Sequence, residues 1–529
     1  VHLGTFAIQR MNLRLGNEAN VNFVENLSLI QEYKMIDDSL WFLSKDKFVA
    51  DFSPVGKDKP GFIGRKTTTY KNVIVNDSSV LKELSKNKTQ EEIITLPNAS
   101  SKGKEFWLAT RHEPLSKAES GIINMIDTLT NAPVFQNFTK TIKFIGTGYK
   151  DIGNFQIGPW MNWMSSNGWE GFRLRFDLGT NKGFHKKIKL HGYLAYGFGD
   201  KKMKGMAEAF FLPKKDPRMY LYVSYTDDLD FGQNYYGEIT QDNIFALALR
   251  KNGIPVKNIK VKEKRFEIFK ETFSWMSNKI SVTHKNYLPL RNLVPLDSFR
   301  TISNSNPLTS FEVSLKLRFA YLERFLETTF YRTSLGSSYP IGEINITQGF
   351  SGILKSSYNY TKVNASISDY MNVPPFGNIS WLVYGGKTFG ILPYTLLDIA
   401  PGNELHYYNK YAFNMMNRWE FIHDQYAGIN FEHNVGNGIF RLFPKLRFRQ
   451  FWTAKALWGT LSEENKSLNF KTGHGFQSLD GNTYLELGTG IDNIFRVFRI
   501  DFVWRVFPST LKKVNDKSFG IFGSFRVGF

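Results

Sequence analysis

Few residues in this sequence have a type and spacing that could do chemistry. The closest grouping is His423, Asp424 and His433, whose imidazole and carboxylate groups could bind a metal ion or transfer protons. The two histidines share a parity along the chain, so one unbroken strand would place them on one face, and a turn or bulge between them would not. We expect hydrogen-bonded structural roles for all three. The sequence therefore predicts no catalytic residue, no cofactor and no metal site, and the protein is not expected to be an enzyme.

Other common chemical motifs are absent or explained by structure. The stretch YGFGDKKMKG (196–205) loosely resembles a glycine-rich phosphate loop, but no helical pattern follows it, so a hairpin turn is the better interpretation. The chain contains no cysteine, which excludes disulfides, thiolate metal sites and cysteine nucleophiles. These observations favour a binding, transport or structural protein.

The composition narrows the class of protein further. The chain has 529 residues with 16% aromatics, including 47 Phe and 24 Tyr. No apolar run approaches the roughly 18–20 residues that a transmembrane helix needs. A large soluble β protein and a transmembrane β-barrel remain. The net charge of +19 is spread over strand-like segments. That distribution suits a basic interior or contact with anionic lipid, and we expect no nucleic-acid partner.

Strict alternation of apolar and polar residues begins near residue 150. It is clearest in GFRLRFDLG (171–179), FEVSLKLRFAY (311–321) and VFRIDFVWRVF (497–507). In a strand, such alternation gives one apolar and one polar face. A lipid-facing Lys or Arg costs roughly 2–4 kcal/mol near the bilayer midplane, so Lys316 and Arg318 together fix the register of their segment. A sandwich could use the same pattern, but the number and length of the segments favour a barrel.

The expected fold is therefore a β protein: a transmembrane antiparallel β-barrel of about 16 strands over residues 150–529. A small α+β region is expected over 1–110. A linker over 111–149 should contain an amphipathic helix at 116–131, because Ser116 and Glu119 have the spacing of a capping box and Pro133 follows the apolar stripe.

One connection within the barrel region is long and apolar. Residues 389–411 hold two prolines, a Pro-Gly-Asn turn and several aromatics. Long connections without their own secondary structure are uncommon and usually functional. We expect this one to fold inward, into the barrel or against its wall.

The surrounding residues carry a resemblance to a known family. The runs PYTLLDIAPGNE (393–404), FNMMNRWEFIHDQYAGINFEHNVGN (413–437), FPKLRFRQ (443–450) and AKALWG (454–459) closely resemble bacterial outer-membrane barrels that bear a domain-of-unknown-function label and carry an N-terminal carboxypeptidase-regulatory-like sandwich. That sandwich is not recognised in this chain. The family is distantly similar to the outer-membrane assembly-factor and two-partner-secretion barrels, which have an inward-folding loop. Their Val-Arg-Gly-Phe tetrapeptide is replaced here by APGNE (400–404), so no loop arginine is carried over.

The resemblance implies a place and a role. It implies a bacterial outer-membrane protein with its N-terminal region in the periplasm, acting in the assembly, insertion or translocation of protein or lipid clients. Expected partners are outer-membrane lipids and lipopolysaccharide, the barrel-assembly machinery that inserts the chain as a client, and a multiprotein outer-membrane complex. A gated or passive channel is the alternative. The candidate residues of the inward loop and barrel interior are Gly402, Asn403, Asn414, Met416, Glu420, Asp424, Tyr426, His433, Arg447 and Arg449.

The two ends of the chain add two expectations. The last strand ends FGIFGSFRVGF, and a terminal aromatic on an alternating strand resembles the signal that outer-membrane barrels present to their assembly machinery. Phe525, Val527 and Phe529 are the expected signal residues. The chain begins at Val1 without a signal-like segment, which suggests a mature or partial chain.

Overall fold

The computed structural model divides the chain into two compact units, one formed mainly by Val1–Lys140 and the other by Thr141–Phe440 and Phe448–Arg526. The structure describes residues 1–15, 21–36, 40–53, 61–75, 77–79, 82, 102–230, 244–254, 257–290, 293, 308–443, 446–470, 477–508 and 518–526. Two of the three expected C-terminal signal residues, Val527 and Phe529, lie outside these ranges.

The first unit contains a small antiparallel sheet and helices. Its strands lie in chain order: β1 (Arg10–Arg14), β2 (Val24–Ile36), β3 (Leu40–Phe52) and β4 (Phe62–Thr69). The helix α2 (Lys104–Thr110) follows. The sheet is centred on β2 and β3, which are rich in aromatic and branched residues and pair over nearly their whole length.

Two longer helices follow α2 in the chain. α3 (Lys117–Asn131) begins with a complete capping box, in which the Ser116 hydroxyl accepts from the Glu119 N–H and the Glu119 carboxylate accepts from the Ser116 N–H. Pro133 ends α3, as expected, but it also opens a second helix that the sequence interpretation missed, α4 (Pro133–Thr147). Proline is favoured at the first position of a helix, where its missing N–H has no intrahelical partner. No helix among the described residues is long and apolar enough to cross a membrane.

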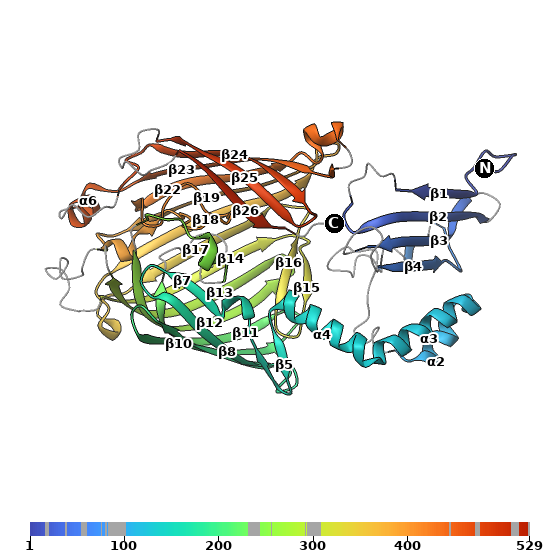
Figure 1. The fold of residues 1–529 in the computed structure, drawn as a ribbon, viewed down its shortest axis with the longest axis horizontal. Coiled ribbons are helices and arrows are strands. Elements are labelled where there is room, and N and C mark those ends of the chain that lie inside the picture. Colours follow the sequence, from blue (N-terminus) through green and yellow to red (C-terminus); the bar gives the residue numbers. More distant parts are fainter. Residues whose placement is uncertain are drawn as a thin grey trace. The chain divides into compact units, whose positions relative to one another are not determined.

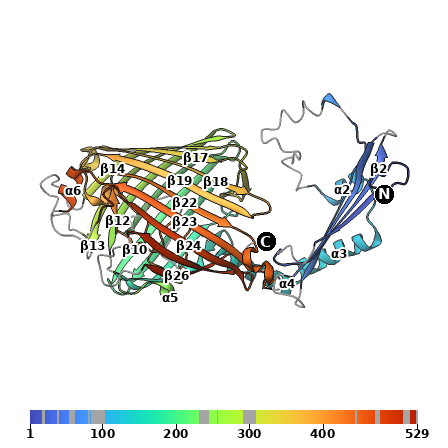
Figure 2. The same ribbon diagram turned by 90° about the horizontal axis from the view of Figure 1, so that it is seen from above.

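The second unit is built on one large antiparallel sheet that curves round as a barrel (Figures 1 and 2). Its strands, in sheet order, are β5 (Lys150–Ile152), β6 (Phe155–Ile157), β7 (Met164–Asn167), β8 (Gly171–Thr180), β9 (Ile188–Gly197), β10 (Lys202–Lys214), β11 (Met219–Asp230), β12 (Asn258–Phe273), β13 (Met276–Leu290), β14 (Leu308–Ala320), β17 (Ile341–Gly349), β18 (Tyr360–Asn372), β19 (Asn378–Phe389), β22 (Gln425–Asn434), β23 (Arg449–Thr460), β24 (Thr483–Ile494), β25 (Phe498–Phe507) and β26 (Phe519–Phe525). Antiparallel ladders link every neighbouring pair from β8 to β26 among the described residues.

The described residues give 18 strands in this sheet, against the expected count of about 16. The difference lies in three short segments at its start. β6 and β7 pair with opposite ends of the same neighbour, β8, while β5 pairs with β6 and stands beside β26 in the strand order. A three- or four-residue strand carries too little alternation to be recognised in a sequence.

Shorter elements lie in the connections of this sheet. They are η3 (Trp160–Asn162), α5 (Phe245–Leu249), the hairpin β15 (Arg324–Glu327) and β16 (Arg332–Gly336), η5 (Ile353–Lys355), η6 (Tyr394–Leu396), the pair β20 (Asp398–Ile399) and β21 (Ile422–His423), η7 (Gly438–Leu442) and α6 (Glu463–Asn469).

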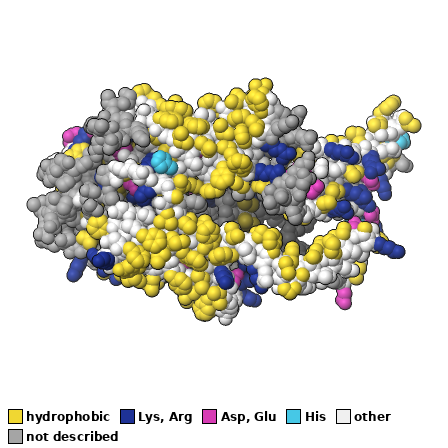
Figure 3. All heavy atoms as spheres, viewed as in Figure 1, with side chains coloured by type: hydrophobic (Ala, Val, Ile, Leu, Met, Phe, Trp, Pro, Cys, Tyr) yellow, Lys and Arg dark blue, Asp and Glu magenta, His cyan; other side chains and the backbone are white. Residues whose placement is uncertain are grey.

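The sheet buries its charged residues and exposes its apolar ones. In β8, Arg173 is 2% exposed and Phe176 is 54% exposed. In β25, Arg499 and Asp501 are buried while Ile500 and Trp504 are exposed. Figure 3 shows hydrophobic side chains covering much of the outer face of the barrel strands. A soluble sandwich has the opposite arrangement, with charges towards water and a dry apolar core.

The inward charges are satisfied by each other. Arg173 of β8 donates to Asp228 of β11, across the two intervening strands, at 2.6 and 2.8 Å, and to Glu170 at 3.1 Å. The Tyr193 hydroxyl donates to the same Asp228 carboxylate at 2.6 Å. Such pairing is what allows charged groups to be held away from bulk water.

The connections differ between the two ends of the barrel. At one end they are mostly short turns, such as 215–218 between β10 and β11 and 274–275 between β12 and β13. β5 lies at this end, because its partner β6 pairs with the last residues of β8. We call it the short-turn end. Most of the long connections, including the one between β19 and β22, lie at the other end, while the connections 321–340 and 435–448 are long ones at the short-turn end.

Candidate functional site: the segment folded inside the barrel

The connection between β19 and β22, residues 390–424, folds back inside the barrel, and we call it the inner segment. Most of it is buried, and Leu392, Phe413, Trp419 and His423 have no exposed surface. It extends beyond the expected 389–411 region to the start of β22.

The inner segment has its own backbone structure. β20 pairs with β21 near its two ends, and Gly402 forms a parallel bridge with Phe413 in the middle. Asn403 N–H donates to the Met416 carbonyl at 2.9 Å. Gly402 allows this close approach, since a Cβ there would lie 2.3 Å from the Asn417 carbonyl oxygen. The glycine is therefore required by backbone contact.

Three hydrophobic clusters attach the inner segment to the barrel wall. In the first, Tyr394 and Trp419 pack with Ile259 and Tyr287 of β12 and β13. In the second, the candidate residues Met416 and Tyr426 meet around Phe413, next to Tyr384 and Tyr484. The third joins Tyr408 to Val503 and Phe522. The inner segment is thus packed like a small core inside a largely polar barrel.

Two lysines hold backbone carbonyls of the inner segment. Lys251, in the connection between β11 and β12, donates to the carbonyls of Asn403 and Asn414 at 2.7 and 2.6 Å. Lys455 of β23 donates to those of Asn409 and Ala412 at 2.7 and 2.6 Å. Burial lowers the pKa of Lys251 to about 8, although Glu486 and Glu404 partly oppose this shift.

Buried carboxylates complete the attachment. Glu486 of β24 accepts from the N–H groups of Asn414 and Met415 at 2.9 and 2.7 Å. Glu404 accepts from Arg418 at 2.5 Å and from Arg250 at 3.1 Å. The Asn403 amide donates to the Asn414 side-chain oxygen at 2.8 Å, so these two candidate residues form one network.

Two further candidate residues act near the ends of the inner segment. Glu420 accepts from Arg505 of β25 at 2.7 Å and from the Asn417 N–H at 2.9 Å. Asp424 accepts from the Ser462 hydroxyl at 2.6 Å and from the Asn465 amide at 2.9 Å. These bonds tie the end of the inner segment to β25 and to α6.

Helix α6 also holds the beginning of the inner segment. The Asn465 side chain accepts from the Leu392 N–H at 2.8 Å, and Asn469 accepts from the Tyr394 N–H at 2.7 Å. Positions i and i+4 face the same side of a helix, so both side-chain amides reach the backbone of residues 392–394. Sequence reasoning missed α6, Lys251 and Glu404. Lys455 and Glu486 were recoverable, because both have the inward parity of their strands.

The middle of the inner segment bonds to the last described strand. Tyr408 N–H donates to the Gly523 carbonyl and Gly523 N–H donates to the His406 carbonyl, both at 2.9 Å. The residue opposite Gly523 in the ladder with β25 is Ile500. The Gly523 N–H and C=O therefore point away from β25, and the inner segment covers that edge of β26 at this residue.

The candidate chemistry of His423, Asp424 and His433 is not supported by their positions. His423 and Asp424 precede β22, whereas His433 lies near its other end, about 30 Å away at the rise of a strand. His433 is on the outward parity, and its Nε2 donates to the Phe376 carbonyl at 2.8 Å. Among the described residues, no group of three or more His, Asp or Glu side chains is arranged to hold a metal ion.

The last two interior candidates differ in placement. Arg447 does not lie in the interior with the inner segment, since it belongs to the connection between β22 and β23, at the short-turn end. Arg449, the first residue of β23, has the inward parity and faces Asp492 in the register with β24. Sequence parity could place Arg449, because it belongs to a strand, but not Arg447, which belongs to a connection.

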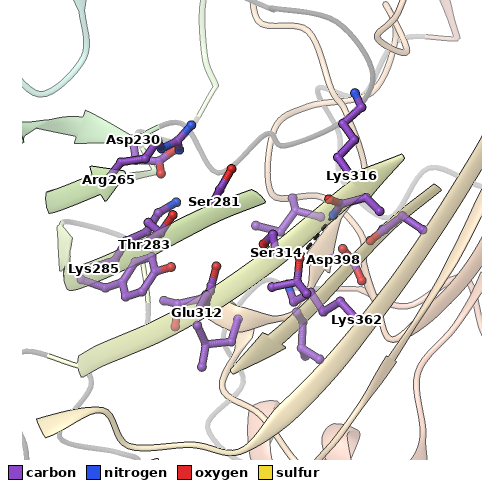
Figure 4. Close-up of a pocket in the computed structure, with 18 of the residues that line it drawn as sticks. Asp230, Arg265, Ser281, Thr283, Lys285, Glu312, Ser314, Lys316, Lys362 and Asp398 are labelled. Atoms are coloured by element: carbon purple, nitrogen blue, oxygen red, sulfur yellow. Dashed lines mark hydrogen bonds between the residues drawn. The ribbon is translucent and has the colours of Figure 1, made fainter. Parts of the chain in front are cut away.

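A chamber remains between the inner segment and the wall formed by β12, β13, β14, β17 and β18. One cavity of about 430 Å³ is lined by the hydroxyl groups of Ser281, Thr283 and Ser314 and by charged groups such as Lys316 and Asp398 (Figure 4). Many of its charges are paired, for example Lys316 with Glu343 at 2.8 Å. The cavity is polar, hydrogen-bonding and without a large excess of either charge.

A second cavity, of about 570 Å³, adjoins the first towards the short-turn end. Arg265, Glu267 and Lys279 line both cavities, and we call the two adjoining cavities together the chamber. Inward rings line this second part, with Tyr220 and Phe269 stacked at 4.8 Å. The chamber therefore extends from the turn residues Phe273–Ser277 to the underside of the inner segment.

A family profile described as the C-terminal domain of a family of unknown function (DUF5686) matches residues 143–469, more than half of the chain. No curated protein matches the sequence. The matched region contains the inner segment and most of the strands around it.

Three solved structures are similar to this chain over part of their length. BamA from Haemophilus ducreyi lacking POTRA domains 1–3 is 11% identical with a TM-score of 0.42, and the match covers 71% of each chain. CdiB from Acinetobacter baumannii is 11% identical with a TM-score of 0.38, covering 68% of this chain and 57% of that one. Wzi from Escherichia coli, an outer-membrane protein involved in group 1 capsule assembly and a carbohydrate-binding β-barrel, is 10% identical with a TM-score of 0.29, covering 78% and 88%. At these scores the likenesses establish nothing about activity.

Proposed function

We propose that this chain, which belongs to the DUF5686 family, is a transmembrane barrel of the bacterial outer membrane with a non-enzymatic role in envelope biogenesis. In this role it inserts or moves protein or lipid clients. Its surroundings are outer-membrane lipids and lipopolysaccharide. The barrel-assembly machinery inserts the chain as a client, and the chain works within a larger outer-membrane complex.

The membrane location is supported by the inverted faces of the barrel strands. A large apolar side chain that stays exposed to water loses about 1.5–3 kcal/mol of the free energy that burial would give. Barrel strands such as β8 expose several of these side chains on their outward face. Lipid removes this cost. In this proposal the sheet closes with β26 beside β5, because an open sheet edge is not tolerated in the hydrocarbon of a membrane.

The orientation follows from the connections. Outer-membrane barrels have short periplasmic turns and longer extracellular loops. The short-turn end is therefore the periplasmic end in this proposal. β5 lies at that end and is the first barrel strand, so the N-terminal region belongs to the periplasm.

The observation that carries the proposed role is the inner segment. It fills the barrel from the long-connection end through three packed clusters and several buried polar bonds, while the chamber below it extends to the short-turn end. A client from the periplasm can enter this chamber, but the inner segment stands in the way of free passage. A standing pore needs no such packed obstruction.

A gated channel is the second candidate. The observation in its favour is that two of the anchors are lysine ammonium groups bonded to backbone carbonyls, which a signal could release. In that case the inner segment is the constriction, and the basic composition of the chain favours anions.

Conductance across planar bilayers separates the two candidates. The wild type should show no large steady current, and Lys251→Met should raise the frequency of openings because it removes two bonds to the inner segment. Lys202→Met, at the exposed turn between β9 and β10, is the matched control and should behave as wild type. A large steady pore in the wild type would overturn the proposed role.

The biogenesis role itself is tested in cells. Depletion should lower the amount of particular outer-membrane proteins or lipids, and crosslinking from a photoreactive residue at Tyr220 in the chamber should capture those same molecules. An unchanged envelope after depletion, together with solute-selective currents, would leave the channel as the function.

A further inference from the structure

Helix α4 presents an apolar face that no described residue covers. Phe138, Ile142 and Ile145 are 61%, 55% and 59% exposed, and Val134 is exposed as well. None of the residues of α4 is buried. On a helix these four residues fall within an arc of about 100°, the width of a stripe that normally meets a core.

The opposite face of α4 is polar and basic. Lys140 and Lys143 lie there, and the sequence from Pro133 to Thr147 contains no Asp or Glu. Lys143 pairs with Asp151 of β5 at 2.9 Å. An apolar face bearing Phe and Ile opposite a lysine-bearing face is typical of helices that lie in the surface of a membrane.

The end of α4 is fixed at the start of the barrel. Trp160 donates its ring N–H to the Ile145 carbonyl at 3.3 Å, and the rings of Trp163 and Phe144 lie 6.3 Å apart. Gly148, with φ of +82°, makes the turn from α4 into β5. Tryptophans gather at membrane–water interfaces, so these contacts suit the boundary of the bilayer.

The barrel strands that follow α4 in the chain also expose apolar side chains. Phe155 of β6 and Leu178 of β8, near the short-turn end, are exposed on the outer face of the strands next to β5. In Figure 3, hydrophobic side chains also follow the helix that Figure 1 labels α4.

We propose that α4 lies flat in the phospholipid surface at the short-turn end of the barrel, with Val134, Phe138, Ile142 and Ile145 at the acyl boundary and its lysines towards the head groups and water. This inference rests on the proposed membrane location of the barrel. It gives α4 a role that a linker lacks. The helix anchors the first strand, β5, at the place where the strand order of the barrel meets β26.

The test uses the absence of cysteine in the chain. Single cysteines replace Phe138 or Ile142 on the apolar face and Gln136 or Lys140 on the polar face, and each carries an environment-sensitive dye. The full-length protein is placed in vesicles of phosphatidylethanolamine and phosphatidylglycerol, with or without lipids that bear a quencher in the upper acyl chain. We expect blue-shifted emission and lipid quenching at 138 and 142, and water-like emission without lipid quenching at 136 and 140.

A dye at Phe176→Cys, on the outward face of β8, separates the two proposals. Quenching at 176 without quenching at 138 and 142 overturns only the inference about α4. The absence of quenching at 176 also overturns the proposal that the barrel spans a membrane.

Two other occupants of the apolar face have different signatures. A second copy of the chain would shield the dyes at 138 and 142 from water to a degree that rises with protein density, and dyes on neighbouring copies would quench each other. A contact with another part of the same chain would protect these positions from water in detergent and leave them insensitive to lipid quenchers. Either result overturns the inference. Phe138→Glu with Ile142→Glu, at exposed positions, should abolish lipid quenching of a dye at 145 while the dye at 176 is unchanged.

Discussion

Acid should release the inner segment through His423. This imidazole lies in β21 without exposed surface, and burial lowers its pKa to about 4, against 6.5 for an exposed histidine. Asp398 on the paired strand and the adjacent Asp424 partly offset the burial, and the Tyr426 ring lies 5.0 Å away. The docked segment therefore holds His423 neutral.

The sign and size follow from proton linkage. Below pH 6.5 the released segment binds a proton that the docked segment does not, so docking weakens as the pH falls from 6.5 towards 4. Between pH 7.5 and pH 5 the free energy of docking should fall by about 2 kcal/mol, and the equilibrium constant for release should rise about 30-fold. Below pH 4 the loss should level off at about 3 kcal/mol.

Hydrogen exchange measures this directly, with rates corrected for their intrinsic dependence on pH. Peptides of the inner segment should lose protection on acidification, while peptides of β12 and β13 serve as the internal reference. His423→Gln should remove the dependence on pH, and His433→Gln, on the outward face of β22, should keep it. Equal protection at pH 7.5 and pH 5, or an unchanged loss of protection in His423→Gln, would refute the reasoning.

Three further predictions concern the same segment and the end of the chain. Gly402→Val should destabilise docking by about 1–3 kcal/mol, since its side chain would collide with backbone atoms, and proteolysis of the segment should accelerate. Gly121→Ala on α3, where nothing lies within 4 Å, is the control and should not accelerate it. Glu404→Gln should cost about 3–5 kcal/mol because it deprives buried Arg418 of its counter-charge, and a double-mutant cycle with Arg418→Gln should show strong coupling; additive effects would contradict the pairing. Deleting Phe529 should impair insertion into the membrane more than any activity of correctly inserted protein, measured as the membrane fraction of newly made chain; equal insertion would count against the terminal signal.

Features that depend on neighbouring residues could be predicted from the sequence. The inward and outward residues of β8, β14 and β25 follow from parity, because successive side chains of a strand point to opposite faces. The start of α3 follows from Ser116 and Glu119, because the side chain of each accepts a hydrogen bond from the backbone N–H of the other. The second helix, α4, carried a readable signal in the spacing of Phe138, Ile142 and Ile145.

Features that depend on distant residues were not predictable. Lys251 meets Asn403 and Asn414 across more than 150 positions, and nothing near Lys251 in the sequence distinguishes it from the many exposed lysines. The same parity of His423 and His433 suggested one face, but β22 begins between them and separates them by most of its length.

Adjacent residues alone predict the strands with one apolar and one polar face and the long apolar connection that begins at residue 389. Both are local properties, since alternation and composition are set by adjacent residues. Tertiary structure alone shows which inward charges meet, that the connection extends to residue 424, and that it is held by lysines, carboxylates and α6. These contacts arise when strands far apart in the chain curve into one barrel, because the curvature brings their inward side chains together around a common interior.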